Sequence, residues 1–275
     1  MYPSGKVSSV QEKQLTTLGN NIHALEVEGN FDDCQRMVKD VFADEALNKK
    51  IFLTSANSIN VARWLPQQFY YFFAWKQWKD KNESPVISVP SGNFGNICAG
   101  LLAQRSGLPV KHFIAACNAN DVVPEYFSTG DYKPKKAIAT ISNAMDVGDP
   151  SNFVRILEMY REDISQLKNM VSSYSVTDEE TRKTIKNVFE NENYLLDPHG
   201  AVAWITLNDY LNLHKNDNGI FLETAHPVKF YDVVEPVIEQ KVPVPESVQI
   251  QLNKEKRSLK IVADSKLVKE FLEKL

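Results

Sequence analysis

The chain has 275 residues, of which 43% are hydrophobic and 24% charged, an ordinary globular composition that suffices for one large domain or two smaller ones. A net charge of -4 gives no electrostatic reason to bind nucleic acid or an anionic membrane surface. The aromatic run 69–75 is far too short to span a bilayer, and three scattered cysteines give neither a disulfide framework nor metal-ligand spacing. We therefore expect a cytoplasmic protein without a metal, membrane or nucleic-acid partner.

The first fifty residues predict elements that need a sheet from elsewhere. Residues 2–6 resemble the turn that follows the end of a strand. Residues 22–28 alternate apolar and polar side chains, as a half-buried strand does. After a turn at Gly29, either Asn30 or Asp32 is expected to cap a helix. One strand and one helix cannot bury their apolar faces alone, so their partner strands must come from another part of the chain.

A run rich in hydroxyls and amides, residues 54–60, precedes a long aromatic helix expected to reach about Trp78. One interpretation is a helix N-terminus capped by Asn57 or Ser58. The other is a loop of hydrogen-bond donors that faces a ligand. The sequence leaves both interpretations open.

The stretch 85–103 predicts a strand, a glycine loop and a helix in that order. The apolar run 85–89 is typical of a buried parallel strand, and residues 97–103 open an apolar helix. This arrangement brings free backbone N–H groups and the positive end of a helix to one point. Gly92 and Gly95 can take positive φ and let an anion approach the main chain closely.

The loop between this strand and helix, residues 91–96, is expected to hold a phosphate group. Five of its six residues are polar or glycine, which favours a phosphate site over a simple connecting turn. It contains no lysine or arginine, so neutral donors would hold a small fixed phosphate such as that of a cofactor. The pattern is neither G-x-G-x-x-G nor the lysine-bearing P-loop, which argues against dinucleotides and ATP.

Later segments extend the same sheet. Residues 110–116 predict the next parallel strand, and Asn118, Asn120 and Asp121 follow at its carboxyl end, where open α/β sheets place ligands. In the turn-rich segment 141–153, Asp146 fits a loop carboxylate satisfied by main-chain donors better than a catalytic acid.

The last third of the chain brings a second group of polar residues to the same edge. Asp197 before Pro198 predicts a helix start, and His199 in its first turn is more often structural than a base. Residues 219–222 predict a strand that places Thr224 at the edge of the phosphate loop. From residue 241 onward we expect a surface tail that ends in a helix.

Five motifs in this order resemble threonine synthase of the bacterial and fungal type: FDDCQ at 31–35, SANSIN at 55–60, PSGNFGN at 90–96, SNAMD at 142–146 and TAHP at 224–227. That family consists of fold type II pyridoxal phosphate enzymes. The resemblance implies an α/β fold with a parallel sheet and helices on both faces, like the β subunit of tryptophan synthase. It also implies the cofactor pyridoxal 5'-phosphate and conversion of O-phospho-L-homoserine and water to L-threonine and phosphate in threonine biosynthesis.

The resemblance also implies roles for individual residues. The cofactor phosphate would be held by Ser91, Gly92, Asn93, Phe94, Gly95 and Asn96. The hydroxyl of Thr224 would hydrogen-bond the pyridine nitrogen. The candidates for contact with the substrate are Ser55, Asn57, Ser58 and Asn60.

One departure from the family pattern is decisive. The Schiff-base lysine of the family lies in an N-terminal segment with a histidine, a glycine and Phe-Lys-Asp, and nothing like this occurs here, so no catalytic residue is assigned. We expect the C-terminal part of the enzyme, inactive alone, with the missing N-terminal portion as its partner. Residues 1–50 would finish an incomplete small domain, 51–240 would form most of the cofactor domain, and 241–275 would be a C-terminal tail.

Two alternatives remain beside this interpretation. One is another lyase of the same fold, such as a threonine dehydratase, against which the segments 55–60 and 142–146 argue. The other is a non-catalytic fragment that binds a phosphate-bearing ligand.

Overall fold

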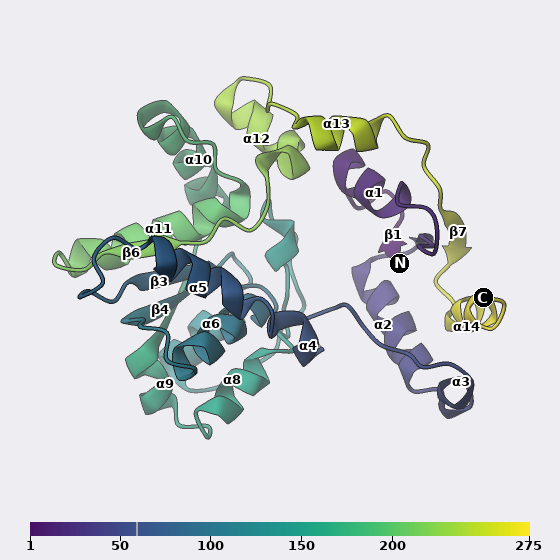
Figure 1. Ribbon diagram of the computed structural model, residues 1–275, viewed down its shortest axis with the longest axis horizontal. Coiled ribbons are helices and arrows are strands. Elements are labelled where there is room, and N and C mark those ends of the chain that lie inside the picture. Colours follow the sequence, from purple (N-terminus) through teal and green to yellow (C-terminus); the bar gives the residue numbers. More distant parts are fainter. Residues whose placement is uncertain (59) are drawn as a thin grey trace. The chain divides into compact units, whose positions relative to one another are not determined.

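The computed structural model describes residues 1–58 and 60–275, and the chain divides into two compact units (Figure 1). Unit 1 consists of residues 1–54 together with 241–275, and unit 2 of residues 55–240. Each unit is an α/β structure with a parallel sheet, as expected. No helix in the described ranges is long and apolar enough to cross a lipid bilayer.

Unit 1 is built on a three-stranded parallel sheet in the order β1-β2-β7. Its strands are β1 (Tyr2–Pro3), β2 (Leu25–Glu28) and β7 (Leu259–Val262). Its helices are α1 (Ser9–Thr16), α2 (Phe31–Phe42), α3 (Glu45–Lys50), α13 (Glu246–Leu252) and α14 (Ser265–Leu272). Asn30 caps α2 by accepting a hydrogen bond from the N–H of Asp33, so of the two candidates the first is the cap.

The C-terminal segment is a structural part of unit 1 and not the surface tail expected from the sequence. Strand β7 pairs with β2 along its whole length, and α14 packs beside α2. The expectation that β2 needs strands from elsewhere is confirmed, because β7 supplies the hydrogen-bonding partners that β2 lacks locally. A small core closes the unit: Leu25, Val27, Cys34, Met37, Val41, Leu47 and Val268.

A buried carboxylate fastens the strands of unit 1 to each other. Glu26 on β2 accepts hydrogen bonds from the hydroxyls of Ser4 (2.6 Å), Tyr2 (3.2 Å) and Ser258 (3.2 Å), and its Oε2 lies 2.7 Å from Nζ of Lys256. The Lys256 ammonium, and after it the Ser4 hydroxyl, lower the pKa of Glu26 to about 2. The ionised form of Glu26 therefore stabilises the fold.

Replacing Glu26 with glutamine is expected to destabilise unit 1 by about 1–3 kcal/mol at pH 7, because Lys256 then loses its ionised acceptor. The folded pKa lies below the unfolded one, so this contribution is present above about pH 4.5 and is lost as pH falls toward 2. Hydrogen exchange of peptides from β2 and α2 in increasing urea measures it. As the control, Glu28→Gln removes the exposed ion pair of Glu28 and Lys260, and it should lower the free energy of unfolding by less than about 0.5 kcal/mol. Equal losses in both variants at every pH would contradict this prediction.

Unit 2 is built on a four-stranded parallel sheet in the order β5-β4-β3-β6. Its strands are β3 (Val86–Pro90), β4 (His112–Cys117), β5 (Val171–Ser175) and β6 (Gly219–Phe221). Its α-helices are α4 (Val61–Trp64), α5 (Gln68–Gln77), α6 (Gly95–Arg105), α7 (Val122–Thr129), α8 (Phe153–Met159), α9 (Ile164–Met170), α10 (Asp178–Glu192), α11 (Pro198–Leu213) and α12 (Tyr231–Ile238). Two short 3₁₀ helices, η1 (Asn143–Met145) and η2 (Pro227–Phe230), follow α7 and β6 respectively.

Helices cover both faces of this sheet, as the strand pattern predicts. Successive side chains of a strand point to opposite faces. On one face, Ile87 and Phe113 join the main core with Leu101 of α6. On the other face, Val86 and Ile114 pack with Leu207 of α11. The central strands β3 and β4 are therefore apolar at nearly every position, and their carboxyl ends meet at one edge.

Candidate functional site

The segment after β3 turns sharply into α6 at the carboxyl edge of the sheet. Phe94 is the N-cap residue of α6 and has a φ of 61°, in the left-handed region. Neither Gly92 nor Gly95 has positive φ, so the expected use of glycine for that backbone conformation was wrong. The buried ring of Phe94 packs edge-on against Phe153 at 5.4 Å, and this packing holds the strained residue in place.

The two glycines are needed because neighbouring segments approach the loop closely. A Cβ on Gly92 would lie 2.5 Å from Cα of Met145, and a Cβ on Gly95 would lie 2.9 Å from Cβ of Ser58. The absence of side chains lets the segments 142–146 and 55–58 close over the loop.

The main chain of the loop presents unpaired donors. The N–H of Ser91 donates to the carbonyl of Ala116 (2.8 Å), and the N–H of Cys98 donates to the carbonyl of Phe94 (3.1 Å). Between them, the N–H groups of residues 92–97 have no protein acceptor within the described part of the chain. Unpaired N–H groups at a helix N-terminus suit an anion, because the helix dipole adds positive potential there.

The side chain of Asn93 fastens the loop to two other segments. Its Oδ1 accepts from the N–H (2.7 Å) and the hydroxyl (2.8 Å) of Ser151, and its Nδ2 donates to Oγ of Ser58 (2.9 Å). Asn152 donates from Nδ2 to the carbonyl of Asn93 (2.9 Å). What Asn93 leaves available to a ligand is its main-chain N–H.

Two further loop side chains are also used within the protein. The hydroxyl of Ser91 donates to the carbonyl of Val89 (2.8 Å). The phenol of Tyr71 donates to both the carbonyl and Oδ1 of Asn96, each at 2.9 Å. These bonds fix the shape of the loop, and the main-chain N–H groups that the sequence predicted as donors stay unpaired.

In the segment 54–60 the structure describes every residue except Ile59, and it tests only the interpretation as a helix N-terminus. The helix cap is Asn60, whose Oδ1 accepts from the N–H of Ala62 (3.1 Å), and not Asn57 or Ser58. The expected long helix is divided into α4 and α5. Ser55 accepts from the N–H of Asn57 (3.1 Å), and Ser58 lies beside the 91–96 loop through its contact with Asn93.

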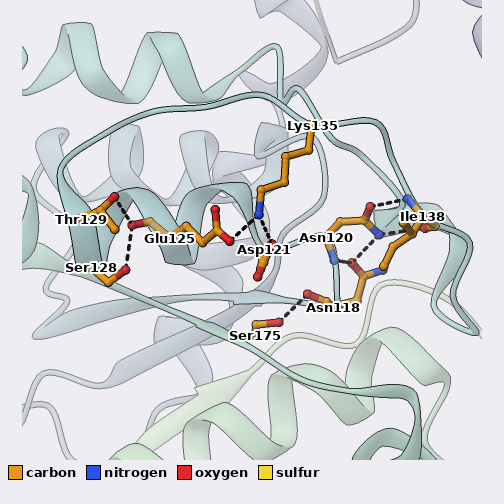
Figure 2. A network of polar contacts seen from close by, with 9 residues as sticks. All are labelled: Asn118, Asn120, Asp121, Glu125, Ser128, Thr129, Lys135, Ile138 and Ser175. Atoms are coloured by element: carbon orange, nitrogen blue, oxygen red, sulfur yellow. Dashed lines mark hydrogen bonds and ion pairs between the residues drawn. The ribbon is translucent and has the colours of Figure 1, made fainter.

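The polar residues after β4 hold the segment 131–140 by hydrogen bonds and ion pairs. In Figure 2, Asn120 exchanges two hydrogen bonds with the main chain of Ile138 (2.9 and 3.0 Å), and Lys135 reaches Asp121 (3.1 Å) and Glu125. The segment 131–140 is thereby fastened to the end of β4 and to α7.

Asp146 belongs to a neighbouring network. Its Oδ1 accepts from the amide of Asn118 (2.9 Å) and the hydroxyl of Thr140 (2.6 Å), and its Oδ2 accepts from the N–H of Thr140 (3.0 Å). Burial raises the pKa of Asp146, although these donors oppose the change. The carboxylate is satisfied within the protein, but of these three donors only the N–H of Thr140 belongs to the main chain, which the sequence prediction had named as the source.

Thr224 lies at the same edge of the sheet as the 91–96 loop. Strand β6 runs parallel to β3 with Phe221 opposite Ser88, so residues that follow each strand emerge on one side. The side chain of Thr224 is exposed. Every lysine in the described ranges is exposed or half-buried, and no group of metal-binding side chains occurs in them.

Comparison with known proteins identifies the class. A family model described as "Pyridoxal-phosphate dependent enzyme" matches residues 1–221, and one described as "Threonine synthase, C-terminal" matches residues 200–272. The chain therefore belongs to the pyridoxal-phosphate dependent enzyme family.

Particular relatives narrow this class to threonine synthases. Threonine synthase of Serratia marcescens is 46% identical over 91% of this chain and 58% of its own length. The crystal structure of the Escherichia coli threonine synthase superposes with a TM-score of 0.90 at 42% identity, over 99% of this chain and 63% of that chain. The structure of the Brucella melitensis threonine synthase, described as PLP bound, gives 0.91 at 33% identity. The chain thus spans 58% to 64% of the length of these relatives.

Proposed function

We propose that this chain is the cofactor-holding part of a threonine synthase, and that the complete protein converts O-phospho-L-homoserine and water to L-threonine and phosphate. The observation that carries the proposal is the set of unpaired N–H groups at residues 92–97, shaped by Gly92 and Gly95 beneath two covering segments. The similarity to threonine synthases over nearly the whole chain supports it. Unit 2 would form the major part of the large domain, and unit 1 the remainder of the small domain.

The residues present fit pyridoxal 5'-phosphate. The main-chain N–H groups of the 91–96 loop and the first turn of α6 would bind its phosphate, while Ser91, Asn93 and Asn96 keep the loop in shape. The hydroxyl of Thr224 would hydrogen-bond the pyridine nitrogen. A neutral partner there leaves that nitrogen largely unprotonated. Bound in this way, the cofactor supplies a moderate electron sink for bonds next to the substrate's Cα.

The substrate side is assigned to the segment that lies against the cofactor loop. Ser58 contacts Asn93, so the segment that carries Ser55, Asn57, Ser58 and Asn60 lies beside the 91–96 loop. Their hydroxyl and amide groups would orient the substrate by hydrogen bonds. No buried lysine occurs in the described ranges, so the lysine that carries the cofactor would come from the portion that the longer relatives possess and this chain lacks.

The cytoplasm is the proposed location, and the state of the cysteines supports it. Cys34, Cys98 and Cys117 are buried free thiols. Burial raises the pKa of Cys98 and of Cys117 to about 12, so both thiols remain protonated and unreactive.

Complementation tests the proposal. We expect no threonine formation from O-phospho-L-homoserine by this chain with pyridoxal 5'-phosphate alone. Adding the N-terminal portion of a related threonine synthase should produce both activity and the absorbance change of a lysine-bound cofactor. Borohydride reduction followed by mass spectrometry should then place the cofactor on the added portion.

The controls distinguish this function from the two alternatives, a dehydratase and a non-catalytic binding fragment. Threonine formed by the chain alone would refute the assignment of the lysine. Turnover of threonine in place of O-phospho-L-homoserine by the complemented protein would instead identify a dehydratase. Phosphate binding without turnover in any combination would leave only a binding fragment.

A further inference from the structure

Two buried carboxyl groups meet between the end of β6 and the start of α11. Asp197, the N-cap of α11, is fully buried, and Glu223 follows β6 and directly precedes Thr224. A Cβ on Gly200 would lie 2.4 Å from Cδ of Glu223, so the Glu223 carboxyl rests on the first turn of α11. We call Asp197 and Glu223 the acid pair.

Three oxygens of the acid pair have no hydrogen-bond donor. Oδ2 of Asp197 and both Oε atoms of Glu223 are buried and without a partner in the described part of the chain, when both groups are treated as carboxylates. A buried acceptor without a donor lowers the stability of the folded state, and a second buried negative charge lowers it further. One proton held between the two groups removes the second negative charge and pairs two of the three oxygens, because a protonated carboxyl is itself a donor.

The geometry around His199 places the single negative charge on Asp197. The N–H of Ala144 donates to Nε2 of His199 (3.2 Å), so this nitrogen is the acceptor and the ring proton is on Nδ1. Nδ1 then donates to Oδ1 of Asp197 (2.6 Å), which also accepts from the N–H of His199 (2.8 Å). The positive end of α11 adds to the stabilisation of a charged N-cap.

We propose that Glu223 is a neutral carboxylic acid at neutral pH that donates its proton to Asp197, and that it acts as a positioning residue for Thr224. A chain of hydrogen bonds would then run from Glu223 through Asp197 and His199 to Ala144. The next residue, Met145, lies against Gly92. These hydrogen bonds would therefore connect the residue beside Thr224 with the segment that covers the 91–96 loop.

The electrostatics of the acid pair agree with this geometry. Burial, and then the hydrogen bond to Asp197, raise the pKa of Glu223 to about 10. Burial also opposes ionisation of Asp197, but hydrogen bonds from His199 and Glu223 outweigh it and lower the pKa of Asp197. Tyr194 also faces the pair, and burial followed by the charges of Glu223 and Asp197 raises its pKa. The role for Thr224 rests on the proposed function, whereas the protonation state of Glu223 does not.

The test compares Glu223→Gln with the unaltered chain, without cofactor or partner. All four tryptophans, Trp64, Trp75, Trp78 and Trp204, lie in unit 2, so their fluorescence reports its unfolding by urea. The folded state keeps a proton that the unfolded state loses above about pH 4.5. The unaltered chain should therefore lose stability relative to Glu223→Gln by up to about tenfold in the folding constant per pH unit, until pH approaches 10.

Direct readouts complete the test. The infrared band of a protonated carboxylic acid should be present in the unaltered chain at pH 7 and absent in Glu223→Gln. Glu223→Ala should speed amide exchange at residues 142–146 and 224–226, and Glu223→Gln should not, because its amide can still donate to Asp197. The control Glu192→Gln changes an exposed glutamate at the end of α10 and should show no such pH trend.

Two results would overturn the inference. The first is a stability difference between Glu223→Gln and the unaltered chain that does not vary between pH 5 and pH 9. The second is equal exchange at residues 142–146 in the glutamine and alanine variants. If Glu223→Ala does not fold, the pH trend and the infrared band of the glutamine variant still decide the protonation state. Neither measurement depends on cofactor binding, so failure here is distinct from failure of the proposed function.

Discussion

Gly92→Ala should destabilise unit 2 by about 3 kcal/mol and abolish phosphate binding at the 91–96 loop. The added Cβ would lie 2.5 Å from Cα of Met145 and 3.2 Å from the carbonyl oxygen of Ala144. Both contacts are with main chain, which cannot turn away as a side chain can. Either the loop or the 142–146 segment must move, and the N–H groups of residues 92–97 then no longer converge. Tryptophan fluorescence in urea measures the stability, and calorimetric titration with pyridoxal 5'-phosphate of the complemented protein measures binding.

The matched control for this variant is Gly130→Ala. Gly130 ends α7 with a φ of 78°, and a Cβ there would meet no atom within 4 Å. This alanine should lower the free energy of unfolding of unit 2 by about 1 kcal/mol, through the strain of a left-handed backbone conformation alone. The position lies in the same unit but away from the loop. Binding by this control should be unchanged. Normal binding by Gly92→Ala would contradict the close approach of Met145 as the feature that shapes the loop.

Asn93→Asp should weaken pyridoxal 5'-phosphate binding by the complemented protein about tenfold to a hundredfold while largely preserving the fold. The new carboxylate keeps an acceptor for the N–H and hydroxyl of Ser151. Ser58 can rotate its hydroxyl to donate where it now accepts from Nδ2 of Asn93. The local hydrogen bonds therefore survive, and the main change is a negative charge beside a site for a negatively charged phosphate. Rising salt should reduce the defect, because counterions screen the repulsion.

The control for charge alone is Asn216→Asp. Asn216 is exposed and precedes β6, at the opposite edge of the sheet from the 91–96 loop. It adds the same charge without approaching the phosphate and should leave binding unaltered. If Asn93→Asp also bound normally, the anion site would have to lie elsewhere on the chain.

Local elements were predictable where the deciding contacts lie within a few residues. The apolar run of β3 followed by the loop and α6, and the cap at Asp197 before Pro198, follow the sequence closely. Unit 2 also has the parallel sheet with helices on both faces that the resemblance implied. Family motifs marked the loop, but its assigned ligand contacts stay predictions until binding is measured.

Contacts between distant residues were not predictable in the same way. Three contacts have no local sequence pattern that predicts them. Tyr71 donates to Asn96, and Asn152 donates to Asn93. The carboxyl of Glu223 lies against Gly200. The cap at Asn60 was missed for a related reason, since hydroxyl and amide side chains at Asn57, Ser58 and Asn60 are equally suited to that role.

The sequence by itself determined the strand, loop and helix within residues 85–103, the strands near 110–116 and 219–222, and the family to which its motifs belong, because these depend on periodicity and on neighbours along the chain. Only the tertiary structure decided that β7 completes the sheet of β2, that Phe94 and not a glycine takes positive φ, and that the acid pair shares one buried environment. The reason is physical: backbone strain, close approach and protonation depend on which atoms surround a residue, and folding brings those atoms from segments far apart in the chain.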